Sequence, residues 1–293
     1  MNHLQIPEAG IDVFYPSEYE EMTSEQAIDI GKILFMTYTG ICDYDMARKM
    51  AVDIFLNRVN GQNKPKLTDE SLNYWANEGI LADSVNFLFQ ITPEISGKTG
   101  FIINPKFCKQ LIDTVKLNGK IYYGAKDLIS DLTIMEYKEA TWRVVKFSET
   151  KEEHWLNELC AVLYALRSGE GETARRAEYS NERMLSGAKD FEDAPVGLKF
   201  MTWLFFTGCL NWIREEAIEI DGTELDFGCL FRSDTGEHTN TARQFDDTGM
   251  TGVLFQMAES GVFGNMEQTC RINVWDIFLR LYQIHMQNKS LKR

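Results

Sequence analysis

Hydrophobic positions are densest between Pro195 and Ile218, where they occupy all sides of a helix rather than one stripe. The apolar residues of this run are Val196, Leu198, Phe200, Met201, Trp203, Leu204, Phe205, Phe206, Cys209, Leu210, Trp212 and Ile213. A helix that is apolar all round is either the buried helix of a large core or a membrane span. Lys199, Asn211 and Arg214 interrupt the run, and no basic segment flanks it. The pattern therefore predicts a central buried helix from Pro195 to about Ala217, with a membrane-associated protein as an alternative.

The chain before this run divides into an arm and a helical region. Residues 1–22 contain Pro7 and Pro16 and predict an irregular N-terminal arm. Over residues 23–167, apolar positions recur at spacings of three and four, which indicates amphipathic helices. Two capping-box pairs predict helix starts in this region: Thr23 with Gln26, and Thr133 with Glu136.

One segment within the helical region has the pattern of paired strands. The sequence VKLNGKIYY, residues 115–123, places Asn118 and Gly119 between two short apolar runs. Asn-Gly favours a type I′ turn because both residues tolerate positive φ. We therefore expect one small β-hairpin near residues 112–123.

Two polar segments complete the predicted organisation. Residues 168–190 are rich in charged and small side chains and indicate a solvated polar linker with a short helix. Residues 191–293 are predicted to be a second helical region that holds the central helix and a long polar loop at 227–247. Loops of that length are usually functional or mobile. The predicted fold is mainly α, a multi-helix globular bundle around a central apolar helix with one small β-hairpin.

Composition narrows the classes of function. Among 293 residues there are 44 acidic and 30 basic side chains, a formal net charge of −14. A nucleic-acid binder needs a basic patch, so this balance argues against such a partner. The N-terminal sequence has no secretory pattern, and we expect a cytoplasmic protein with reduced thiols. The six cysteines lie far apart: Cys42, Cys108, Cys160, Cys209, Cys229 and Cys270.

The sequence contains no pattern that specifies a catalytic, cofactor-binding or metal-binding residue. Cys229 and His238 share a loop, but zinc signatures use tighter ligand pairs. Neighbouring acids such as Glu215 with Glu216 and Asp246 with Asp247 are typical of solvated faces. Arg175, Arg176 and Arg183 allow a phosphate or an acidic partner, and the plainer interpretation is again a solvated run. We therefore predict no catalytic, cofactor or metal residue.

Three blocks carry a resemblance to a known family. The first is YYGAKDLISDLTIMEYKEA (122–140), which leads through a predicted helix at 152–166 into LCAVLYALR (159–167). The other two are APVGLKFMTWLFFTGCLNWI (194–213) and TGVLFQMAESGVFGNMEQTCRINVWDIFLRLYQI (251–284). In this order they resemble a family of mainly helical proteins encoded by phages and prophages of gut anaerobes near tail genes. The resemblance implies a non-enzymatic, chaperone-like role in tail assembly in the bacterial host cell. It also implies contacts with other phage tail or virion-assembly proteins, and not with nucleic acid or membrane.

An enzyme is the alternative class. Its site would have to be assembled from dispersed acidic residues together with Cys209 or His285. A deep polar pocket that joins these residues would favour that alternative.

Overall fold

The chain is mainly helical in a computed structural model that describes residues 1–6, 11–57, 72–95, 98–168, 175–220, 222–231 and 249–291. The helices are α1 (Ser24–Tyr38), α2 (Tyr44–Phe55), α3 (Leu72–Asp83), α4 (Ile134–Thr150), α5 (Glu153–Leu163), α6 (Asn181–Glu192), α7 (Val196–Glu215), α9 (Gly249–Glu259), α10 (Met266–Cys270) and α11 (Val274–Leu291). The prediction of a mainly α protein is confirmed. In the described part of the chain, no helix is long and apolar enough to cross a membrane.

The strands form five two-stranded antiparallel sheets within the described residues. The pairs are β1 (Asn2–Ile6) with β2 (Ile11–Tyr15), β3 (Phe89–Ile95) with β4 (Lys98–Ile103), β5 (Thr114–Leu117) with β6 (Lys120–Tyr123), β7 (Arg167–Ser168) with β8 (Arg175–Arg176), and β9 (Ile218–Ile220) with β10 (Thr223–Leu225). The β5–β6 hairpin is the predicted one, and Asn118 and Gly119 have the expected positive φ values of 50° and 76°. The expectation of a single hairpin is wrong, because four other pairs form.

The prediction of an irregular N-terminal arm is also wrong. Residues 1–22 contain the β1–β2 hairpin, whose register pairs His3 with Phe14. The two rings stack with centroids 4.2 Å apart, and the His3 ring lies 2.6 Å from an Asp12 oxygen. Cross-strand side-chain pairs of this kind stabilise a short hairpin that proline content alone argues against.

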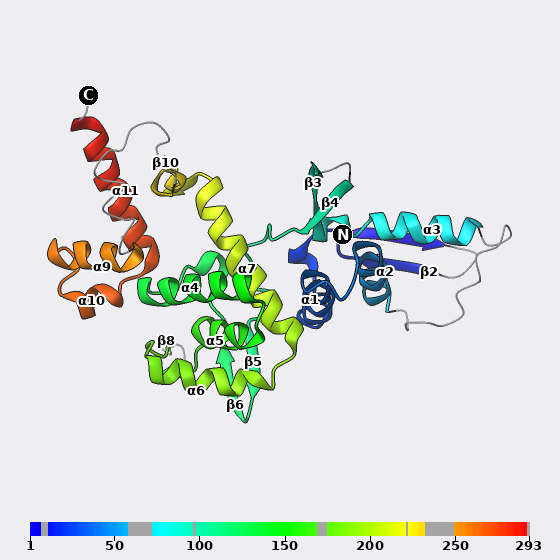
Figure 1. Cartoon of the computed structure of the whole chain (residues 1–293), viewed down its shortest axis with the longest axis horizontal. Coiled ribbons are helices and arrows are strands. Elements are labelled where there is room, and N and C mark those ends of the chain that lie inside the picture. Colours follow the sequence, from blue (N-terminus) through cyan, green and yellow to red (C-terminus); the bar gives the residue numbers. More distant parts are fainter. Residues whose placement is uncertain are drawn as a thin grey trace. The chain divides into compact units, whose positions relative to one another are not determined.

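Compact packing divides the chain into two units (Figure 1). Unit 1 comprises Met1–Ile112 with Asp193–Phe205, and unit 2 comprises Asp113–Glu192 with Phe206–Arg293. The boundary between Phe205 and Phe206 falls inside α7, so each unit contains one part of this apolar helix. Another boundary between the units follows Glu192, close to the end of residues 168–190, the segment predicted as a linker.

In unit 1, backbone atoms of α1 and of the first half of α7 lie in contact with each other. The capping box predicted at Thr23 and Gln26 begins α1. Gly197 of α7 has no room for a side chain, because a Cβ there would lie 1.9 Å from the carbonyl oxygen of Ile28. Gly31 faces the same contact from α1, where a Cβ would lie 2.2 Å from the carbonyl oxygen of Gly197. These glycines let the two helices pack more closely than side chains permit.

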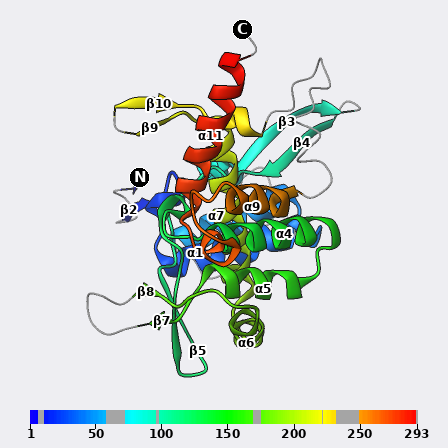
Figure 2. The same cartoon turned by 90° about the vertical axis from the view of Figure 1, so that its left-hand side faces the viewer.

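In unit 2, α4, α5 and α6 lie side by side (Figures 1 and 2). The middle helix, α5, buries nearly every residue from Leu156 to Leu163. Gly187 of α6 sits over Ala161, where an added Cβ would come within 3.2 Å of the alanine methyl group. The second half of α7 belongs to this unit, and its Phe206 ring lies 6.0 Å from Tyr137 of α4.

The C-terminal elements differ from the sequence expectation at the predicted loop. Asn265 with Gln268 forms a capping box that starts the short α10, and a separate helix α11 begins at Val274. The predicted loop 227–247 starts with a short 3-10 helix at Phe227–Leu230, in which Phe227 is completely buried against Phe278. Residues 232–247 of that loop lie outside the described residues.

Replacing Gly197 tests the contact between α1 and α7. Gly197→Ala should lower the free energy of unfolding by about 3 kcal/mol, because the new methyl group meets backbone atoms that cannot turn away. Gly79→Ala is the matched control. Its Cβ would meet no atom within 4 Å, so alanine in α3 should instead raise stability by up to about 1 kcal/mol. Urea unfolding measures both, and equal stability of the two variants would contradict the contact.

Candidate functional site

The arginines of the predicted solvated linker are mostly buried. The side chain of Arg176 is 12% exposed and that of Arg183 is 16% exposed. The expectation of a solvated charge run is therefore wrong for these two residues. The reason is that residues 181–192 form α6, which packs against α5, and β8 lies along β7. The side chain of Arg175 lies outside the described residues.

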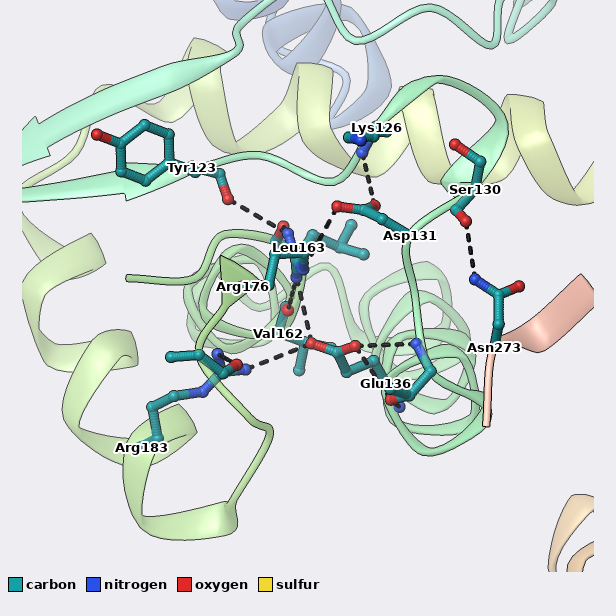
Figure 3. Close-up of polar contacts among 12 residues, drawn as sticks. Tyr123, Lys126, Ser130, Asp131, Glu136, Val162, Leu163, Arg176, Arg183 and Asn273 are labelled. Carbon is teal, nitrogen blue, oxygen red and sulfur yellow. Dashed lines mark hydrogen bonds and ion pairs between the residues drawn. The ribbon is translucent and has the colours of Figure 1, made fainter. Parts of the chain in front are cut away.

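Arg176 is the centre of a polar cluster that Figure 3 shows. Its Nη1 atom donates to the carbonyl oxygens of Leu163 at 2.9 Å and Tyr123 at 3.3 Å. Its Nη2 atom donates to the carbonyl oxygen of Val162 and to Glu136 Oε1, both at 3.2 Å. Two of these carbonyls lie at the C-terminal end of α5, where unpaired oxygens and the helix dipole favour a cation.

Glu136 divides its two carboxylate oxygens between two tasks. Oε2 accepts from the backbone N–H and the hydroxyl of Thr133, which completes the capping box of α4. Oε1 faces Arg176 at 3.2 Å and the Nη2 atom of Arg183 at 3.5 Å. Because Glu136 is only 3% exposed, these partners supply the stabilisation that water cannot. One carboxylate thus joins a helix start to two arginines that lie 40 and 47 residues further along the chain.

Arg183 is held less completely than Arg176. Its Nη1 atom donates to the Ala177 carbonyl oxygen at 2.6 Å, and its guanidinium lies 5.7 Å from the centre of the Tyr179 ring. Burial lowers the pKa of Arg183, and the negative charge of Glu136 opposes that effect. Arg183 nevertheless stays charged at neutral pH, as arginine does in proteins.

Another buried arginine connects the same helices. Arg143 of α4 is 3% exposed, and it donates to Glu139 at 2.7 Å and to Glu158 of α5 at 3.0 Å. Its Nη2 atom lies 3.5 Å from the sulfur of Met184 in α6. Burial raises the pKa of Glu139, but the hydrogen bonds and positive charges of Arg143 and Lys138 together outweigh that effect and leave the pKa lowered.

The β5–β6 hairpin is attached to α6 through Asp190. This carboxylate accepts hydrogen bonds from the Lys120 amine at 2.7 Å, the Asn118 amide at 3.0 Å and the Tyr122 hydroxyl. The bond from Lys120, followed by those from Tyr122 and Asn118, lowers the pKa of Asp190 to about 2. Burial and the same carboxylate raise the pKa of the Tyr122 phenol. One side chain of the predicted Asn-Gly turn and two side chains of β6 therefore fix the hairpin to the helix.

The residues that precede α4 also bind the residues that precede α11. The backbone of Ile134 donates to Ile272, and that of Val274 donates to Leu132, at 2.9 and 3.0 Å. The Asn273 amide donates to the Ser130 carbonyl oxygen at 2.8 Å (Figure 3). The residues that begin α4 and those that begin α11 are thus joined by backbone and side-chain bonds.

This arrangement has the chemistry of a structural cluster. Its carboxylates pair with buried arginines, and Glu136 also accepts hydrogen bonds from the backbone N–H and the hydroxyl of Thr133. Within the described residues, no group of three or more His, Cys, Asp or Glu side chains has the geometry to hold a metal ion. The guanidinium groups hold the ends of helices, which is a positioning task.

Cys209 is completely buried on α7, and His285 is half-buried on α11. Glu215 and Glu216 are exposed where α7 ends. Cys229 is half-buried, whereas His238, Asp246 and Asp247 lie outside the described residues.

No protein-family model, curated protein or solved structure matches this chain.

Only one part of the cluster was predictable from the sequence. The capping-box spacing found Thr133 and Glu136, but it gave no sign that Glu136 also binds two arginines. The signal that was present is the occurrence of Arg176 and Arg183 in a segment that ends in an amphipathic helix. Their burial depends on how α6 packs, which local spacing does not specify.

Neutralising Glu136 tests the cluster. Glu136→Gln keeps an oxygen for the capping box but leaves Arg176 and Arg183 without their shared carboxylate, so the free energy of unfolding should fall by about 2–4 kcal/mol. Glu152→Gln removes the same charge at a site 61% exposed and should change it by less than about 0.5 kcal/mol. Urea unfolding compares them, and equal stabilities would show that the cluster contributes nothing.

The hairpin attachment predicts a dependence on pH. Asp190 has a lowered pKa in the folded state, so its contribution is fully present above the unfolded pKa near 4 and is lost as the pH falls towards 2. Asp190→Asn should lower the melting temperature at pH 7, and the difference from the unchanged protein should shrink between about pH 4 and pH 2. Glu182→Gln, exposed on the same helix, should follow the unchanged protein. A difference that stays constant down to pH 2 would contradict the attachment.

Proposed function

We propose that this chain is a non-enzymatic phage or prophage protein that acts through protein–protein contacts in tail assembly, in a chaperone-like role. The resemblance of residues 122–140, 159–167, 194–213 and 251–284 to proteins encoded near tail genes supplies the class. One structural observation supports the mode of action. Large apolar side chains stay exposed on regular elements of both units, where a partner can cover them.

In unit 1 three of the exposed apolar residues lie on the β3–β4 hairpin. Ile91 is 74% exposed and Ile102 is 51% exposed, although both lie on strands. Phe101, opposite Ile91 in the register, stacks on Tyr44 with ring centroids 3.6 Å apart. The stack fixes the hairpin to α2, so its exposed apolar atoms are presented on an ordered support.

In unit 2 two of the exposed apolar residues lie on α4. Trp142 is 46% exposed and Val145 is 47% exposed, one helical turn apart. On the inner side of this helix, Arg143 and Val144 are buried. A helix whose inner face packs and whose outer face carries a tryptophan is typical of a protein interaction surface.

The buried charges are consistent with this role. Arg143, Arg176 and Arg183 bind carboxylates and backbone carbonyls within unit 2, so they hold the helices that carry the exposed residues. The proposal also keeps α7 as the central helix of the fold, since its apolar residues are buried in both units. Its partners would be other tail or virion-assembly proteins in the cytoplasm of the host cell.

Co-expression tests the proposal. The full chain, produced alone and together with each tail protein of the phage or prophage that encodes it, should form a defined heavier complex with at least one of them. Light scattering coupled to size-exclusion chromatography gives the mass of each species. A matched set of capsid proteins from the same phage is the control. If the chain stays separate from every tail component, the proposed role in tail assembly is wrong.

A further inference from the structure

An exposed tryptophan of α4, Trp142, meets a half-buried tryptophan of α5, Trp155. Trp142 and Trp155 have ring centroids 5.0 Å apart and planes at 85° to each other. The ring of His154 lies 4.3 Å from that of Trp155, and the His154 side chain is 53% exposed. We call these three residues the aromatic corner. Perpendicular indoles differ from a flat apolar patch because they present one ring face beside the edge of another.

The geometry of the corner suits a cation better than an alkyl chain. The face of an aromatic ring carries negative charge density, and tryptophan has the strongest attraction for ammonium and guanidinium groups. Trp142 already makes this interaction, because the Arg143 guanidinium carbon lies 5.4 Å from its ring centre. Almost half of the Trp142 surface remains open to solvent.

The charges around the corner favour the same kind of ligand. Residues 134–163, from the start of α4 to the end of α5, contain six acidic and four basic side chains. Within this segment, Lys138 pairs with Glu139, Arg143 with Glu139 and Glu158, and Lys146 with Glu149. Glu152 is 61% exposed and has an oxygen 3.9 Å from the His154 ring. The Glu152 carboxylate therefore lies beside the aromatic corner.

We propose that the aromatic corner binds an arginine or lysine side chain from a basic segment of a partner protein. The inference rests on the proposed function, because it names the chemistry of the partner at one of the exposed surfaces. The cationic group lies against Trp142, and the carboxylate of Glu152 balances its charge. A net charge of −14 on the whole chain brings a basic segment towards the protein before contact is made.

Three short peptides test the identity of the ligand. Acetylated hexapeptides of alternating glycine and arginine, glutamine or leucine are titrated into the full chain, and isothermal titration calorimetry measures binding. The arginine peptide should bind, and its affinity should fall as salt rises from about 50 to about 300 mM because charges are involved. Equal binding of the leucine peptide would show an apolar docking site and overturn the proposal. Equal binding of the glutamine peptide would overturn it as well.

Substitutions locate the binding. Trp142→Leu should weaken the arginine peptide about tenfold, whereas Trp142→Phe, which keeps an aromatic face, should weaken it less. Phe255→Leu removes an aromatic ring that is 53% exposed on α9 and should leave the affinity unchanged. Circular dichroism melting shows whether each variant remains folded. If folded Trp142→Leu binds the arginine peptide as tightly as the unchanged chain, the corner is not the site.

The outcome is separable from that of the proposed function. If Trp142→Leu loses the peptide and also forms less of a complex with a tail protein, the corner is part of that interface. If the complex forms equally with the variant, the inference is wrong and the role in tail assembly stands. If the peptide binds at the corner and no tail protein joins the chain, the corner stands as a cation site and the role in tail assembly is wrong.

Discussion

The burial of Arg176 is the constraint on which the organisation of unit 2 depends. A guanidinium group that leaves water must regain its hydrogen bonds and a counter-charge, or its burial costs several kcal/mol. Here the acceptors are the last carbonyls of α5, a carbonyl of β6 and the carboxylate that caps α4. A shift of any one of these elements would leave a buried donor unpaired. The arginine therefore fixes a helix start, a helix end and a strand at one point.

Glu136 shows where local sequence reasoning succeeds and where it stops. The spacing from Thr133 to Glu136 specifies a helix start because both partners lie within one turn, and the structure has that capping box. The bonds from Glu136 to Arg176 and Arg183 join residues 40 and 47 positions apart, so they depend on the packing of α6 against α5. The polar composition of residues 168–190 predicts solvent contact because composition does not report pairing. The arginines look alike in the sequence whether they face water or a buried carboxylate.

The hairpins also differ in whether the local sequence predicts them. The β5–β6 turn was predictable because Asn118 and Gly119 tolerate the conformation that the turn requires. The β3–β4 hairpin has no comparable local signal, and the contact that fixes it is the stacking of Phe101 on Tyr44, a residue of α2. Gly197 illustrates the point for helices. Within an apolar run a glycine suggests a weaker helix, whereas its effect here is to let α1 and α7 touch.

The matched charges inside unit 2 decide where the acidity of the protein acts. Arg143, Arg176 and Arg183 are buried beside Glu136, Glu139 and Glu158, so the ions of the cluster nearly cancel one another. The excess of acidic residues therefore lies outside this cluster, and an exposed charge acts on other molecules within about 10 Å in moderate salt. The helices α4 and α5, which carry Trp142 and Glu152 at their surface, are held together by buried ion pairs. In our proposal, the same kind of interaction that stabilises the fold also selects the charge of a partner.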